Sequence, residues 1–155
     1  MSAHASNPLA RGPVLLIGAD GQLGTELRKA LAARGIAPVM SSLHGTLPDG
    51  GTARACDLSA PGALAALVRE VAPAIVINAA AYTAVDRAES EPALAARINA
   101  EAVRELGDTA KALGATVVHY STDYVFAGDG ARPYREDDAP GPVSVYGRTK
   151  REGEQ

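Results

Sequence analysis

The sequence predicts an α/β fold with a doubly wound parallel sheet, and three observations support this class. Short apolar runs alternate with longer segments of helical periodicity along most of the 155-residue chain. Hydrophobic residues make up 46% of the chain and aromatic residues only 4%, so Ala, Val, Leu and Ile must fill the core. Connections long enough to hold a helix favour parallel strands with right-handed crossovers. We therefore expect a Rossmann-type sheet.

Five short runs are the expected strands. The first, PVLLIG, is apolar throughout, as a strand buried on both faces of a parallel sheet should be. Pro38 in the second run indicates an edge-like or loose start. The expected strands are residues 13–18, 36–40, 52–56, 74–78 and 116–121.

Helices are expected between these strands. Leucines at every fourth position predict a helix that stops at Gly35, and Pro61 suits the first turn of the next one. A longer helix begins at Glu91 and ends at Gly114, and residues 144–155 read as the opening of another. Residues 44–51 and 127–142 are rich in turn-forming residues and predict loops. The inward positions expected are Leu23, Leu27, Leu31, Leu64, Leu67, Val68, Val71, Leu94, Ile98, Val103 and Leu106.

Composition excludes several classes of function. The net charge of −3 argues against nucleic-acid or membrane-surface binding, because both favour a basic face. Cys56 is the only cysteine, which excludes a disulfide framework and a thiolate metal cage and favours a small buried side chain. No segment approaches the roughly 20 apolar residues of a membrane span, so we expect a cytoplasmic protein. Residues 1–12 are expected to be flexible, and 13–155 to form one dinucleotide-binding domain.

Glycines at Gly18, Gly21 and Gly24 join the first strand to the first helix. In a GxxGxxG turn the first glycine allows the tight turn, the second lets backbone approach a pyrophosphate, and the third lets the helix pack on the sheet. A purely structural turn is the alternative, but the strand before and the helix after favour dinucleotide binding. Asp20 is an unfavourable neighbour for a pyrophosphate and must point away or be screened.

The acid that usually binds the ribose 2′-hydroxyl, about 20 residues after the glycines, is absent. The second strand ends in Met40, Ser41 and Ser42, with no arginine nearby that would grip a 2′-phosphate. NADPH is favoured over NADH because nothing there repels the extra phosphate, although NADH stays open.

Tyr146 and Lys150 lie at i and i+4, on one face of the last expected helix. A cation close to a phenol lowers its pKa from about 10, so that it can exchange a proton with a carbonyl or alcohol near neutral pH. A solvated helix face is the alternative interpretation. Thr122, at the end of the fifth strand, could hydrogen-bond the same substrate oxygen, or simply be a turn residue.

These features together resemble the extended short-chain dehydrogenase/reductases. The segments GADGQLG, INAAAYTAVDRAE, YSTDYVF and VYGRTKREGE, in this order, are similar to those of the dTDP-4-dehydrorhamnose reductases, which make dTDP-L-rhamnose for bacterial cell-surface glycans. The resemblance runs from about Val14 to Glu154. It implies NAD(P)H-dependent reduction of the C4 carbonyl of dTDP-4-dehydro-L-rhamnose.

The resemblance also implies roles for individual residues. Tyr146 would donate the proton, Lys150 would hold the nicotinamide ribose and tune that tyrosine, and Thr122 would assist them. Thr122 and Asp123 would contact the sugar nucleotide. The cofactor would contact Gly18, Gly21, Gln22, Leu23, Gly24, Asp57, Leu58, Ala79, Ala80, Ala81, Tyr120, Tyr146 and Lys150. Asn99 would support Lys150 through water, or be an exposed polar residue of its helix.

Tyr124 distinguishes reduction from dehydration, because related dehydratases carry a glutamate there to protonate the leaving hydroxyl. A non-catalytic NAD(P)-binding subunit is the alternative function, although such a subunit would not need Thr122, Tyr146 and Lys150 together. Family members are about twice this length, so we expect the last strands and the substrate domain to be absent and this polypeptide to have little activity alone. Some members bind Mg²⁺ at a dimer contact where Glu26 matches, but no metal site is assigned, and a homodimer stays open.

Overall fold

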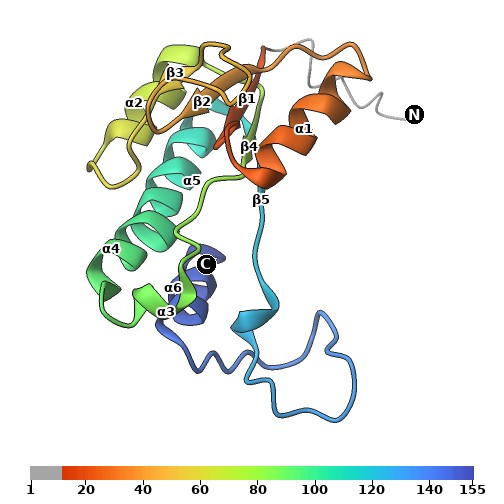
Figure 1. Ribbon diagram of the computed structural model, residues 1–155, viewed down its shortest axis with the longest axis vertical. Coiled ribbons are helices and arrows are strands. Elements are labelled where there is room, and N and C mark those ends of the chain that lie inside the picture. The colour runs from red at the N-terminus through yellow and green to blue at the C-terminus, as the bar shows by residue number, and fades with distance from the viewer. Residues whose placement is uncertain (1–11) are drawn as a thin grey trace. The chain divides into compact units, whose positions relative to one another are not determined.

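The computed structural model describes residues 12–155 (Figure 1). Residues 1–11 of the segment expected to be flexible therefore lie outside the described residues. The fold divides into two compact units. Among the described residues, the first comprises residues 12–80 and Glu105–His119, and the second comprises Ala81–Arg104 and Tyr120–Gln155.

The first unit holds a sheet that confirms the expected fold class. Every adjacent pair of strands is parallel, and the order among the described residues is β3-β2-β1-β4-β5. The central strand β1 pairs with β2 on one side and β4 on the other, so the chain changes direction across the sheet at this point. The strands are β1 (Val14–Ile17), β2 (Val39–Ser42), β3 (Arg54–Ala55), β4 (Ile75–Asn78) and β5 (Thr116–His119).

Helices cover both faces of this sheet. Figure 1 shows α1 (Gln22–Ala32) on one face and α2 (Ala63–Val71) with α5 (Ala102–Leu113) on the other. All four residues of β1 are buried, and Leu64, Val68 and Leu106 are fully buried. Burying each such side chain contributes about 1.5–3 kcal/mol to holding these layers together.

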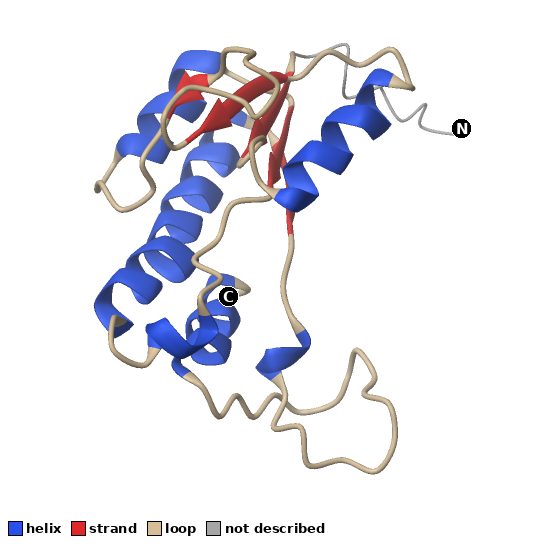
Figure 2. Ribbon diagram, viewed as in Figure 1, coloured by secondary structure: helices blue, strands red, loops and turns tan. Residues whose placement is uncertain are grey.

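The second unit is built from short helices. It contains α3 (Val85–Ala88), α4 (Pro92–Ala96), a π-helical turn η2 (Arg97–Glu101), a 3₁₀ turn η3 (Asp123–Val125) and α6 (Val145–Gly153). Helix α6 packs against the other four elements of this unit. Ser144 caps α6 by accepting a hydrogen bond from the Gly147 amide at 3.0 Å. The long connection before α6 is irregular, as expected for residues 127–142 (Figure 2).

Several expected boundaries were wrong. Strand β2 begins at Val39 rather than residue 36, because the Ile36 amide still bonds to Leu31 at the end of α1. Strand β5 ends at His119, before Thr122. Pro61 lies in a turn ahead of α2, whose N-cap is Gly62.

Two positions expected to point inward are exposed. Leu23 is 39% exposed and Leu94 is 38% exposed. In α1 the closest packing is made by Gly24 rather than by the leucines, since Gly24 is the one residue of that helix that is buried. Cys56 is buried, as expected.

Candidate functional site

The glycine turn follows β1, at the carboxyl edge of the sheet. Gly18 has a φ of +74°, and a Cβ there would lie 2.8 Å from the Ala80 amide nitrogen. A Cβ on Gly24 would lie 2.0 Å from the Gly18 carbonyl oxygen. These two glycines therefore let α1 and the turn after β4 approach the end of β1. Gly21 has no such contact within 3.4 Å, so the protein's own packing does not explain it.

The first turn of α1 is available to an anion. Its N-cap is Gly21, and no side chain of the described residues caps it. The first amides of a helix have no partner inside the helix and attract negative charge. An open hollow of about 480 Å³ lies here, lined by Asp20, Gly21, Gln22, Thr25 and Glu26. The arrangement fits a pyrophosphate, although Asp20 contributes an unfavourable charge.

The end of β2 lies beside this turn. The Ala19 amide donates to the Ser41 carbonyl at 2.9 Å, and Ser42 donates its hydroxyl to Thr46 at 2.9 Å. Both serines are buried. The position where an acid would bind a ribose 2′-hydroxyl thus carries a small neutral side chain, as the sequence indicated.

The remaining first-unit candidates follow β3 and β4. The Asp57 carboxylate accepts from the Ser59 amide at 2.8 Å and the Ser59 hydroxyl at 2.6 Å, and these bonds lower its pKa. Asp57 therefore holds its own turn, while Leu58 beside it is buried. Ala79 and Ala80 form the turn against which Gly18 packs.

Asn78 stabilises this turn, and sequence reasoning missed this role of Asn78. Its side-chain oxygen accepts from the Ala80 amide at 3.2 Å, and its side-chain nitrogen lies 3.2 Å from His119 Nδ1 on β5. Asn78 is buried at the end of β4, in register with His119. The sequence signal that could have indicated this role is a polar residue at the end of a buried apolar strand.

Tyr146 and Lys150 lie on α6 in the second unit. Lys150 is only 3% exposed, and its Nζ donates to the Tyr120 carbonyl at 2.6 Å. Burial lowers the pKa of Lys150, and the nearby Glu154 carboxylate acts in the opposite direction. Tyr146 is half-buried, with its ring edge-to-face against Tyr124 at 5.6 Å between centroids. The structure therefore places the Lys150 ammonium against the Tyr120 carbonyl, with Tyr146 one turn earlier on the same helix.

Thr122 begins the η3 turn instead of ending a strand. Its hydroxyl accepts from the Tyr124 amide at 3.3 Å and donates to the Asp123 carboxylate at 3.2 Å. This turn packs on the start of α6, where a Cβ on Gly147 would lie 2.3 Å from the Tyr124 carbonyl oxygen. The segment carrying both substrate-binding candidates thus lies against the helix of Tyr146. Ala81 belongs to the same unit and is half-buried.

Asn99 is not an exposed helix residue. It is 1% exposed in the π-helical turn, and it bonds the Tyr82 backbone and the Thr149 hydroxyl. Sequence reasoning missed both Thr149 and the π-helical turn.

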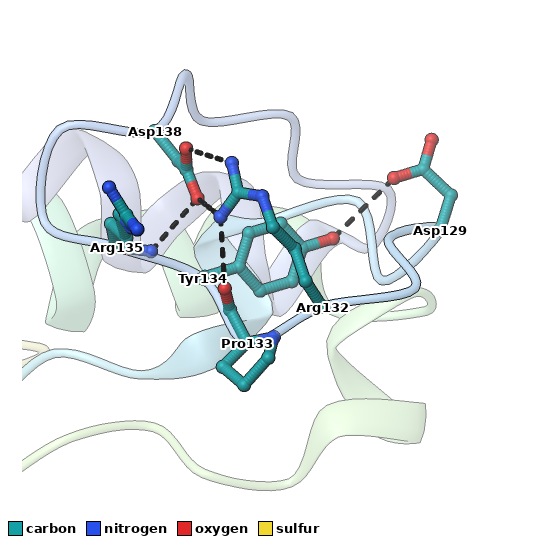
Figure 3. A network of polar contacts seen from close by, with 6 residues as sticks. All are labelled: Asp129, Arg132, Pro133, Tyr134, Arg135 and Asp138. Carbon is teal, nitrogen blue, oxygen red and sulfur yellow. Dashed lines mark hydrogen bonds and ion pairs between the residues drawn. The ribbon is translucent and has the colours of Figure 1, made fainter.

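The loop before α6 is held by its own side chains (Figure 3). Arg132 pairs with both oxygens of Asp138, at 2.8 and 2.7 Å, and the Arg135 amide donates to the same carboxylate at 2.8 Å. These partners lower the pKa of Asp138 to about 2. Phe126 and Tyr134 stack with ring centroids 4.3 Å apart. The loop is therefore an ordered part of the second unit.

Comparison with known proteins identifies the family. The RmlD substrate binding domain family matches residues 12–155. The chain belongs to this family. It is 47% identical over 142 residues to the dTDP-4-dehydrorhamnose reductase of Escherichia coli strain K12, an alignment that covers 92% of this chain and 45% of that protein.

Solved structures of RmlD relatives have the same fold. A dTDP-4-dehydrorhamnose reductase from Clostridium acetobutylicum superimposes with a TM-score of 0.80 at 38% identity, covering 92% of this chain and 47% of that one. A Bacillus anthracis relative, in complex with NADP, gives a TM-score of 0.80 at 35% identity, covering 93% and 48%. The chain thus spans about half the length of the relatives it matches.

Among residues 12–155, no helix is long and apolar enough to cross a membrane. Within the same residues there is no group of three or more His, Cys, Asp or Glu side chains that could hold a metal ion.

Proposed function

We propose that the chain provides the NADPH-binding and proton-donating residues of a dTDP-4-dehydrorhamnose reductase. The observation that carries the proposal is the buried Lys150 on the same helix face as Tyr146, in a chain of the RmlD family. The substrate would be dTDP-4-dehydro-L-rhamnose and the product dTDP-L-rhamnose, a precursor of cell-surface polysaccharide.

The first unit would bind the cofactor's pyrophosphate and adenosine. The uncapped start of α1 supports this role, as does the space left at Gly21. Asp57 and Leu58 would border the adenine, and Ala79 and Ala80 would leave room for the cofactor. Ser42 in place of an acid favours NADPH over NADH, since no carboxylate repels the 2′-phosphate.

The second unit would carry the proton-transfer residues. A nicotinamide held here would supply the hydride for C4 of the sugar, and the former carbonyl oxygen would then need a proton. Tyr146 would donate that proton, and Thr122 would hydrogen-bond the same oxygen. The Lys150 ammonium donates to Tyr120, so it has further N–H groups to hold the nicotinamide ribose. Asp123 would contact the sugar nucleotide.

Replacing Tyr146 with phenylalanine tests this proposal. In the full-length protein, turnover of the dTDP-sugar with NADPH should fall by about 10²- to 10⁴-fold, the range for losing one acid–base catalyst. Tyr134→Phe is the matched control, because Tyr134 lies in the loop before α6 and stacks on Phe126. Unchanged turnover in Tyr146→Phe would exclude Tyr146 as the proton donor.

A further inference from the structure

A buried side-chain hydroxyl lies between the helix of Tyr146 and Lys150 and the rest of the second unit. Thr149, the residue before Lys150, is only 4% exposed. Its Oγ1 donates to the Tyr146 carbonyl at 2.9 Å and accepts from Asn99 Nδ2 at 3.1 Å. Hydrogen bonds of threonine to its own helix are common, but the second bond, from another element, is not a property of the helix alone.

The direction of these hydrogen bonds is fixed by the backbone. Asn99 Oδ1 accepts from the Tyr82 amide at 2.8 Å, and Asn99 Nδ2 donates to the Tyr82 carbonyl at 3.0 Å. Because a backbone N–H can only donate and a carbonyl can only accept, the side-chain amide has one orientation. The second Nδ2 hydrogen therefore points to Thr149, whose own hydrogen remains for Tyr146.

The Tyr146 carbonyl, which accepts the Thr149 hydroxyl hydrogen, also connects Tyr146 to Lys150 along the helix. In an α-helix the carbonyl of residue i accepts from the amide of residue i+4, so Tyr146 and Lys150 share one backbone hydrogen bond. Thr149 adds a second donor to that carbonyl and ties it to Asn99 in the π-helical turn. Removing the hydroxyl would leave the buried Asn99 donor without its partner and remove one of the contacts that hold the rotation of the helix.

We propose that Thr149 is a positioning residue that fixes the rotation of α6 and so the placement of the Tyr146 hydroxyl and the Lys150 ammonium. This inference rests on the proposed reductase function. Thr149 touches neither substrate nor cofactor in this scheme and acts through Tyr146.

Thr149→Val tests the inference, because valine keeps the shape and removes the hydroxyl. In the full-length protein, kcat should fall about tenfold, and the Kd for NADPH, measured by fluorescence, should change by less than kcat, because the first unit would still bind the pyrophosphate and adenosine. Thr149→Ser should restore kcat to within about threefold, because the hydroxyl is the group required. Thr109→Val, at a buried helical threonine of the first unit, is the control and should leave kcat unchanged.

A second measurement does not depend on activity. Without cofactor, amide hydrogen exchange of residues 148–151 should be about tenfold faster in Thr149→Val than in the wild type or Thr149→Ser. Equal exchange rates in all three proteins, or equal kcat values in an active enzyme, would overturn the inference. An inactive wild-type protein with faster exchange in Thr149→Val would instead count against the proposed function and leave the positioning of α6 supported.

Discussion

At the scale of single residues, Gly24 is the described glycine with the least room for a side chain. A Cβ would lie 2.0 Å from a backbone oxygen and 2.8 Å from the Ala19 Cα, and neither can move like a side-chain tip. Gly107 on α5 is the opposite case, with no atom within 4 Å of the added Cβ. The same substitution should therefore have opposite effects at the two positions.

We expect Gly24→Ala to lower the free energy of unfolding by about 1–3 kcal/mol, the usual cost of overpacking. Gly107→Ala should raise it by about 0.5–1 kcal/mol, because alanine loses less backbone entropy in a helix. Urea unfolding of both variants measures these changes. A Gly24→Ala protein as stable as the wild type would show that α1 does not need this close packing.

At the scale of elements, the sequence predicted the strands and the presence of a helix at residues 144–155, because buried parallel strands and helical segments have local signals. The π-helical turn has none, since it shifts the 3.6-residue period instead of ending it. Asn99 shows the consequence. Because Asn99 is polar, an exposed position was an open alternative from the sequence. Its burial is explained by its hydrogen-bond partners Tyr82 and Thr149, which lie far apart in sequence. The hydrogen bond from Lys150 to Tyr120 could not be predicted from the sequence either, because it joins two segments separated by a long loop.

The order of the loop before α6 should depend on Asp138. Asp138→Asn should weaken the pairing with Arg132 and release the Arg135 amide, so trypsin should cleave after Arg135 several times faster. Asp137→Asn is the matched control, because the neighbouring Asp137 is exposed. Equal cleavage rates in the two variants would mean that Asp138 does not order the loop.

The same carboxylate sets a pH range for the loop. The pKa of Asp138 is lowered from 3.8 to about 2. The ionised carboxylate therefore stabilises the loop fully above the ordinary carboxyl pKa, and this stabilisation is lost as the pH falls through about 2. Titration of the Asp138 carboxyl by NMR measures this midpoint. A midpoint near the ordinary value of about 3.9 would contradict the paired geometry.

At the scale of the whole molecule, cofactor binding should raise the free energy of unfolding. NADPH at 100 times its Kd should raise the free energy of unfolding of the full-length protein by about 2.7 kcal/mol and shift the thermal transition upward. NADH at the same concentration should give a smaller shift, because the end of β2 carries no acid that would bind its 2′-hydroxyl. A larger shift with NADH would reverse the proposed preference.

The pairing of β1 with β4 has a consequence for synthesis on the ribosome. Val14 pairs with Ile75, so one side of the fully buried strand β1 has no partner until roughly 60 further residues have been made. At about 5–20 residues per second, that interval is on the order of 3–12 s. During this time the apolar segment VLLI is exposed on a nascent chain, and it is the segment we expect a ribosome-associated chaperone to bind first.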